Sequence, residues 1–217
     1  GRHGRKGLRS FSVSGRVKKP GVHLAPAGIT AKELIDEYCG GMLDGHAFYA
    51  YLPGGASGGI LPAAMADIPL DFDTLQPHGC FIGSAAVIVL SDRDTAVGAA
   101  RNMMRFFAHE SCGFCTPCRV GTTLVRNMMD KISLGHGSPY DINELFKLHR
   151  LMQGASHCGL GNSACNSIFD TLRKFRPAYE RRLQSLDFAP AFDLDGALAR
   201  ARRMTGRDDA GAHFGPE

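Results

Sequence analysis

The sequence predicts an α+β fold in which a strand-rich part is followed by a helical part, with the change near residue 94. Before residue 94, short apolar runs alternate with turn residues such as glycine and proline. After it, apolar residues recur at helical spacing in four segments. With 217 residues, 44% of them hydrophobic, the chain can form one large domain or two small ones.

The strand-rich part is expected to contain one helix among its strands. The first strand is predicted over residues 11–17 and the second over 22–24, with a Lys-Pro-Gly turn between them. A capping box opens a short helix over 30–38. Further strands are expected at 47–52 and within 80–90. This order is typical of one helix packed on a mixed sheet.

The helical part is expected to be a four-helix bundle. Asp94 is predicted to cap the first helix, and Pro117 suits the start of the second. Asp141 and Glu144 form a capping-type pair at the start of the third helix. The four segments are 95–109, 117–132, 141–153 and 163–175. Helices of this length with short connections favour a bundle.

These patterns divide the chain into three expected regions. Residues 1–94 form the strand-rich domain and residues 95–186 the helical domain. Residues 187–217 are predicted to be a basic, partly disordered tail with a short helix at 197–204.

Charge and hydropathy exclude several classes of protein. The net charge is +4, with seven Lys and Arg and no acidic residue in 1–19, and nine basic against four acidic residues in 171–207. We interpret these segments as solvated faces or partner-docking arms, because no motif supports nucleic-acid binding. No signal peptide or membrane-length apolar run is visible, so a cytoplasmic protein is expected. Because the chain begins with Gly, we expect a fragment that lacks an N-terminal part.

Four cysteines have the spacing of a metal-cluster site. Cys112, Cys115 and Cys118 are separated by two residues each, and Cys158 follows much later. The close thiols can converge on one centre, and the distal thiol can close the shell. Four thiolates are the usual ligands of a [4Fe–4S] cluster. The spacing therefore favours Cys112, Cys115, Cys118 and Cys158 as iron ligands.

Other interpretations of the cysteines remain open. Structural zinc usually takes two CxxC pairs rather than a triplet and a single thiol. A disulfide framework fits poorly with seven cysteines in an intracellular chain. A CxxC redox motif leaves two thiols unexplained. Cys165 competes with Cys158 for the fourth position, but Cys158 precedes a Gly-Leu-Gly loop that permits close approach. Cys39 and Cys80 are expected in the core.

Several other residues are predicted to support the cluster site. Gly113 and Gly121 are expected to let the backbone approach it. Arg119, His109 and His157 are candidates to offset negative charge or to hydrogen-bond sulfur. The glycine-rich loop at 54–59 lacks a following Gly-Lys-Ser/Thr, so we interpret it as a turn or close-approach loop.

The motifs resemble a known family. The segment Glu110-Ser-Cys-Gly-Phe-Cys-Thr-Pro-Cys-Arg119, with Cys158 at its distance, resembles the cluster motif of the flavoprotein (NADH-binding) subunit of respiratory complex I. The beta subunits of NAD-dependent formate dehydrogenases and the diaphorase of NAD-reducing hydrogenases share this subunit type. Ser12 to Gly21, with 54–59, 70–73 and 83–90, resembles the family's ubiquitin-like, soluble-ligand-binding β-grasp domain. The resemblance covers about residues 5–185, and His157 to Gly161 looks most similar to formate dehydrogenase.

The resemblance implies an electron-relay function. In this family a nicotinamide exchanges hydride with FMN, and the flavin exchanges single electrons with the [4Fe–4S] cluster. The flavin- and NAD-binding domain is expected to be absent from this chain, so the chain alone is not expected to be catalytic. Gly159 and Leu160 are implied to lie near the flavin in the whole protein.

The resemblance also implies partner subunits, and the residues leave two alternative functions open. The partners would be a thioredoxin-like [2Fe–2S] subunit and a larger iron–sulfur or molybdenum-containing subunit, without nucleic acid or membrane insertion. The alternatives are a zinc-stabilised interaction domain without redox activity, and a β-grasp ligand-binding module in which the cluster is only structural.

Overall fold

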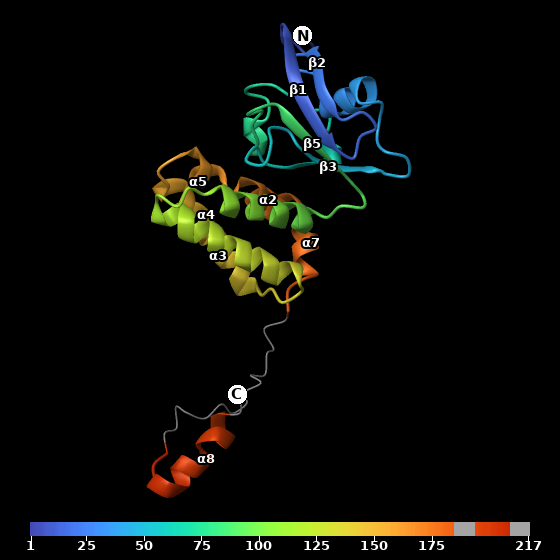
Figure 1. Cartoon of the computed structure of the whole chain (residues 1–217). Helices are drawn as coiled ribbons and strands as arrows, with labels where there is room; N and C mark the ends of the chain where they lie inside the picture. The colour runs from blue at the N-terminus through green and yellow to red at the C-terminus, as the bar shows by residue number, and fades with distance from the viewer. Residues whose placement is uncertain (185–193, 209–217) are drawn as a thin grey trace. The chain divides into compact units, whose positions relative to one another are not determined.

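The computed structural model describes residues 1–184 and 194–208 (Figure 1). Residues 1–184 form one compact unit, and the described residues 194–208 belong to a second. The expectation of a partly disordered tail falls largely outside the described residues. Within the second unit, α8 (Leu194–Thr205) contains the basic helix predicted at 197–204. None of the helices in the described ranges has the length and apolar character needed to cross a membrane.

The first unit contains a five-stranded mixed sheet in the order β2-β1-β5-β3-β4. The neighbours β1 and β5 are parallel, whereas the pairs β1–β2, β3–β5 and β3–β4 are antiparallel. The strands are β1 (Leu8–Gly15), β2 (Gly21–Pro26), β3 (Phe48–Leu52), β4 (Leu61–Pro62) and β5 (Ala86–Ser91). The strands predicted near 11–17, 22–24 and 47–52 are confirmed. The short strand β4 is not among the predicted elements.

The helix expected at 30–38 packs on this sheet. It begins as an α-helix and continues as a π-helix. Thr30 and Glu33 make the predicted capping box at the start of α1 (Ala31–Glu33). A π-helical turn, η1 (Leu34–Tyr38), continues the segment. Apolar side chains from the strands and this helix form the core beneath the sheet, where each buried large side chain contributes about 1.5–3 kcal/mol. They include Phe11, Val13, Leu34, Val87 and Val89.

The strand expected within residues 80–90 is confirmed and occupies the second half of that segment. Residues 80–85 are loop, and β5 begins at Ala86. Ala85 has a φ of 54°, which is outside the β region, so a strand cannot pass through it. Cys80 and Ile82 are nevertheless buried. Their apolar character therefore reflects burial in a loop that follows the turn η3 (Gln76–His78).

Three long helices form most of the helical part, and two of their caps differ from the prediction. They are α2 (Ala96–Glu110), α3 (Thr116–Ser133) and α4 (Pro139–Ala155). Thr95, rather than Asp94, caps α2. Asp94 instead binds the guanidinium of Arg16 and the backbone of Ser91.

The start of α4 lies earlier in the chain than predicted. Ser138 is the N-cap residue of this helix. Asp141, at position N3, completes the capping box with it. Glu144 does not take part in the cap and binds Lys147 instead. The carboxylate of Asp141 accepts hydrogen bonds from the backbone and hydroxyl of Ser138 and from Lys131, which fixes it within the first turn.

The helix predicted over 163–175 is wrong in its extent. The structure has the shorter helix α6 (Asn166–Lys174) there, preceded by α5 (Gly159–Ser163) and followed by α7 (Arg176–Glu180). Helix α2 packs on α3 and α6, and α3 packs on α4. Their apolar faces share a core that includes Met104, Val125, Met129, Leu145 and Ile168. Met104 and Met129 are fully buried in this core.

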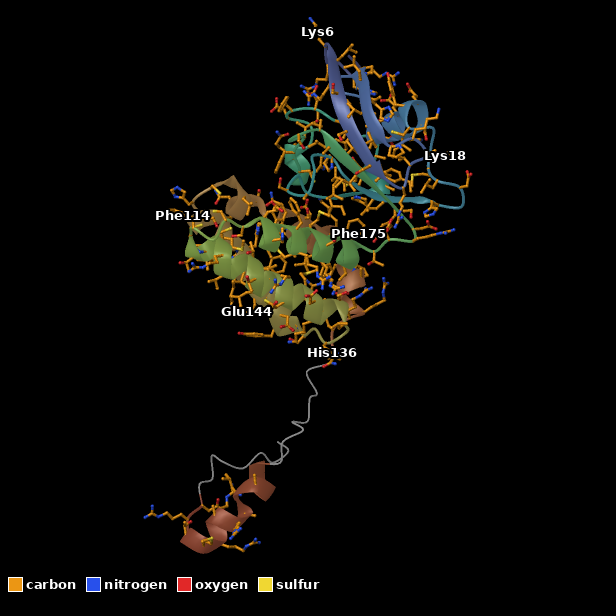
Figure 2. The ribbon with its side chains drawn as sticks, viewed as in Figure 1. Lys6, Lys18, Phe114, His136, Glu144 and Phe175 are labelled. Carbon is orange, nitrogen blue, oxygen red and sulfur yellow. The ribbon has the colours of Figure 1, made fainter. Side chains whose placement is uncertain are left out.

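The sheet and the helices of the first unit meet through an apolar and a polar contact. Phe175 lies at this junction (Figure 2), 5.3 Å from the ring of Tyr49, and packs with Met103 against Leu52. The polar contact joins α6 to the loop at 54–60. Asn166 and Ser167 donate hydrogen bonds to backbone carbonyls of this loop. The glycine-rich loop is therefore a close-approach loop, as predicted.

Candidate iron–sulfur site

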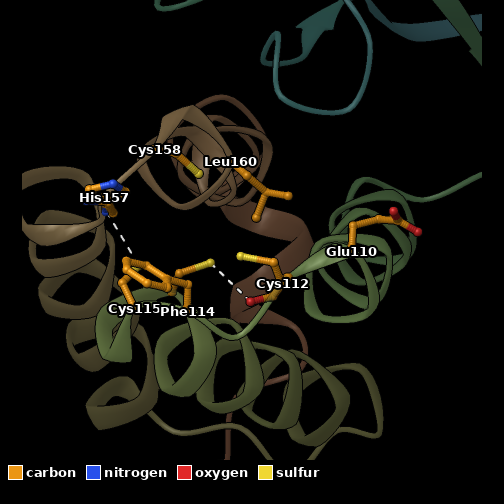
Figure 3. A pocket seen from close by; sticks show the side chains of 9 residues that line it. Glu110, Cys112, Phe114, Cys115, His157, Cys158 and Leu160 are labelled. Atoms are coloured by element: carbon orange, nitrogen blue, oxygen red, sulfur yellow. Dashed lines mark hydrogen bonds between the residues drawn. The ribbon is translucent and has the colours of Figure 1, made fainter.

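The four predicted ligands lie around one cavity. Cys112, Cys115, Cys118 and Cys158 line a hollow of about 450 Å³ together with Glu110, Ser111, Phe114, His157 and Leu160 (Figure 3). The rival thiol, Cys165, does not line it. Cys165 is buried behind the site, where its thiol donates a hydrogen bond to Met152. Two segments that are distant in sequence thus place four sulfurs at one place.

Helix ends bring these segments together. Helix α2 ends at Glu110, and a tight turn containing Gly113, with a φ of 75°, leads to Cys115. Cys115 is the N-cap residue of α3, so Cys118 lies in the first turn of that helix. On the other side, α4 ends at Ala155 and Cys158 is the N-cap residue of α5. The helix termini leave thiols and free backbone N–H groups near one another.

Hydrogen bonds favour a negative charge at one of the sulfurs, and a hydroxyl lies beside another. The backbone N–H of His157 donates to the Cys115 Sγ at 3.5 Å. This bond and that from the Cys118 N–H lower the pKa of the Cys115 thiol, because they stabilise the thiolate. The Ser111 Oγ lies 3.3 Å from the Cys118 Sγ. Thiolates are the form in which cysteines bind iron.

The cavity is closed on one side and open on the other. Cys118 is buried, whereas Cys112 and Cys158 are exposed. Phe114 is 77% exposed at the rim, and its ring lies 5.3 Å from that of His157. Leu160 is half-buried and joins the apolar core of the helices, while Gly159 beside it is exposed. A group in this cavity would contact both the core and the surface.

The shape of the site fits a group of several atoms. Among the residues that the structure describes, no three His, Cys, Asp or Glu side chains come close enough together to hold one metal ion. The four thiols surround a space instead. At its buried side, a Cβ on Gly161 would come within 3.0 Å of the Cys118 Cβ, so the glycine permits the approach of α5. A cluster held by four thiolates matches this donor set.

Some predicted supporting residues have other roles. A Cβ on Gly121 would lie 2.6 Å from the Met152 Sδ, so this glycine serves helix packing rather than the cavity. His109 is exposed and lines a different hollow with Arg105. Arg119 donates to the carbonyl of Gly113 and so braces the cysteine turn. Of the three predicted cationic candidates, His157 alone lines the cavity.

Ser111 is a site residue that the sequence patterns do not indicate. Its hydroxyl contacts the Cys118 sulfur and also accepts a hydrogen bond from the backbone N–H of Gly113. The available signal is that Ser111 is adjacent to the first cysteine of the triplet. Adjacency in sequence does not indicate which way a side chain points, so the role of Ser111 becomes visible only in the folded chain.

Comparisons with known proteins agree with this geometry. Residues 98–182 match the family model "NADH-ubiquinone oxidoreductase-F iron-sulfur binding region". The chain is 35% identical over 178 residues to an NADH-quinone oxidoreductase protein of Rhizobium meliloti, a match that covers 82% of this chain and 42% of that protein. It is 35% identical over 186 residues to NADH dehydrogenase [ubiquinone] flavoprotein 1, mitochondrial, of Dictyostelium discoideum, covering 85% and 39%.

A solved structure extends the similarity to the fold. A crystal structure of an NAD⁺-reducing [NiFe]-hydrogenase in the H2-reduced state matches with a TM-score of 0.76 and 39% sequence identity. That match covers 99% of this chain and 36% of the hydrogenase chain. The chain thus spans about two fifths of the length of the curated relatives and of the solved structure.

The fold and the cavity lined by four thiols are those of an iron–sulfur protein. More narrowly, residues 98–182, which contain all four cavity cysteines, belong to the NADH-ubiquinone oxidoreductase-F iron-sulfur binding region family.

Proposed function

We propose that this chain is the electron-relay part of the NADH- and FMN-binding subunit of an NAD-linked oxidoreductase, and that it carries a [4Fe–4S] cluster. The observation that carries the proposal is the meeting of Cys112, Cys115, Cys118 and Cys158 around one cavity inside the matched iron–sulfur region. A bound [4Fe–4S] cluster would supply reversible one-electron chemistry.

The residues of the chain have distinct roles in this proposal. The four thiolates would hold the iron ions, and the N–H groups of His157 and Cys118 stabilise the negative charge on Cys115. Leu160 lines the cavity and packs against the apolar core of the helices. The exposed side, at Gly159 and Phe114, leaves room for close approach of a redox partner. We assign Gly159 and Leu160 to the side that faces the flavin.

The parent enzyme is proposed to use NAD and FMN. We favour a formate dehydrogenase-like or complex I-like enzyme in the cytoplasm. Its partners would be a thioredoxin-like [2Fe–2S] subunit and a larger iron–sulfur or molybdenum-containing subunit. The N-terminal basic segment is a weak docking candidate, because Arg2, Arg9, Arg16 and Lys18 pair with acidic side chains of the same unit.

We further interpret residues 1–94 as a ubiquitin-like β-grasp domain and residues 95–186 as a four-helix bundle domain. The strand order, with a parallel central pair and one helical segment between β2 and β3, supports the first interpretation. The packing of α2, α3, α4 and α6 around one core supports the second. The two domains are in contact within one compact unit.

Anaerobic reconstitution of the full chain tests the function. We expect about four irons and four sulfides per chain, together with a reversible one-electron signal in EPR spectra. A single zinc without colour would instead support an interaction domain. A cluster that forms but cannot be reduced and reoxidised would support a purely structural role. Either result would overturn the relay function.

A further inference from the structure

Cys118 differs from the other three cavity thiols in its environment. It is buried, and a side-chain hydroxyl, that of Ser111, lies 3.3 Å from its sulfur. Both residues line the same cavity. Ser111 is also the C-cap residue of α2, so the end of this helix fixes its backbone. The hydroxyl therefore occupies a defined place beside a buried thiol.

The surrounding hydrogen bonds indicate which atom donates. The backbone N–H of Gly113 donates to the Ser111 Oγ at 3.3 Å, which uses one acceptor position of the hydroxyl. The hydroxyl proton remains available for the Cys118 Sγ. When Cys118 is a thiolate, its sulfur has no proton to donate, and only the Ser111 O–H can supply the bond. Gly113 thereby orients Ser111 toward the sulfur.

We propose that Ser111 is a positioning residue that donates an O–H···S hydrogen bond to Cys118 and raises the reduction potential of the bound cluster. The inference rests on the proposed function. Reduction adds an electron and increases the negative charge on the cluster and its sulfur ligands. A hydrogen bond to a ligand sulfur stabilises this more negative state in preference to the oxidised one. Burial of Cys118 strengthens the effect, because water does not compete for the sulfur there.

The experiment is an EPR-monitored redox titration of the reconstituted full chain and three variants. In Ser111→Ala, we expect a shift of the midpoint potential to more negative values, with unchanged iron and sulfide content. Ser111→Thr keeps a hydroxyl and should restore the potential. Ser163→Ala is the matched control, because the Ser163 hydroxyl bonds the backbone carbonyl of Gly159 and no sulfur. Its potential should equal that of the unmodified chain.

A spectroscopic readout makes the test independent of electron transfer. In the reduced cluster, ENDOR spectra should show a weakly coupled proton that exchanges in D₂O and that Ser111→Ala lacks. If Ser111→Ala does not assemble the cluster, Ser111→Cys replaces it. The thiol is a weaker hydrogen-bond donor, so the midpoint potential should lie below that of Ser111→Thr. The inference would be overturned if Ser111→Ala had the same midpoint potential as the unmodified chain and kept the exchangeable proton. Failure of the unmodified chain to bind iron and sulfide would instead overturn the proposed function.

Discussion

At the scale of single residues, access to the cavity separates the cysteines into two groups. Burial raises the pKa of the Cys39 thiol to about 11 and of the Cys80 and Cys165 thiols to about 12, which keeps them protonated and inert. The other four open onto one cavity, and hydrogen bonds hold the pKa of Cys115 below its usual value. The remaining thiols, Cys112, Cys118 and Cys158, share that cavity.

This division predicts opposite effects at the two candidates for the fourth ligand. Cys158→Ala should abolish the cluster and leave the unfolding free energy of the iron-free chain unchanged, because the side chain is exposed. Cys165→Ala should retain the cluster and lower that free energy by about 1–2 kcal/mol, since it creates a small cavity in the core. Iron analysis and urea unfolding measure the two effects. A Cys158→Ala chain with full iron content would contradict the ligand assignment.

Asp94 gives the chain a predictable acid sensitivity. Hydrogen bonds from Arg16, together with one from the Ser91 backbone, lower its pKa from 3.8 to about 2 despite partial burial. The unfolded chain therefore takes up the proton first as the pH falls. The stabilisation by this carboxylate is complete above about pH 4 and is lost as the pH approaches 2.

Asp94→Asn should accordingly cost about 1–2 kcal/mol at pH 7 and almost nothing at pH 2. Urea unfolding at a series of pH values measures this convergence. Asp44→Asn is the control, because Asp44 pairs with Lys18 but is 91% exposed, compared with 19% for Asp94. A constant difference between Asp94→Asn and the unmodified chain across this range would refute the assignment.

At the scale of elements, local patterns are most reliable where local interactions decide the structure. The Thr30–Glu33 capping box and the return of β2 after its turn follow from neighbouring residues, and both predictions are confirmed. The predicted cap of α2 is wrong because Asp94 binds Arg16, a charged partner that only the fold supplies. The predicted cap of α4 is wrong because Ser138 begins the capping box and Asp141 completes it. The break between α5 and α6 could not be predicted, since the pattern of apolar residues continues across it.

The loop at 54–60 depends on contacts that only the folded chain provides. Gly59 has a φ of 85°, and a Cβ there would lie 2.6 Å from the Cys80 Sγ. Gly41 has nearly the same φ of 85°, but nothing lies within 4 Å of its Cβ position. Alanine substitutions at these two glycines therefore distinguish the cost of backbone strain alone from the cost of strain combined with a steric clash.

Gly59→Ala should destabilise the chain by about 2–4 kcal/mol, because it adds a clash in a packed junction to the backbone strain. Gly41→Ala should cost only about 1–2 kcal/mol. Thermal or urea unfolding of the iron-free variants measures both values. Equal costs would show that the loop does not pack tightly against Cys80.

At the scale of the whole compact unit, a buried ion pair joins the sheet to the helices. The Asp170 carboxylate accepts hydrogen bonds from the Ile60 backbone and the Cys80 thiol and lies 3.0 Å from the Lys174 ammonium. Lys174 in turn donates to the carbonyls of Ile60 and His78. The pairing of α6 with these loops was not predictable, because its partners lie about 90 to 115 residues apart in sequence.

This junction also bears on the candidate site. The helix α6 follows α5 directly, and α5 begins at the N-cap residue Cys158. The distal thiol is therefore connected, through two short helices, to the contact that anchors the sheet. The cysteine triplet is predictable from local spacing alone, but the position of Cys158 opposite it depends on this long-range packing.

Asp170→Ala should lower the unfolding free energy by about 3–5 kcal/mol, because it leaves Lys174 buried without its counter-charge. The side chains of the pair are only 7% and 17% exposed. Arg176 and Glu180 form a matched i,i+4 pair on α7 that is largely exposed, so Glu180→Ala should cost less than about 1 kcal/mol. Urea unfolding of the full chain, with limited proteolysis at residues 54–60, measures the difference. Similar costs for the two variants, or unchanged cleavage of that loop in Asp170→Ala, would show that the buried ion pair does not join the sheet to the helices.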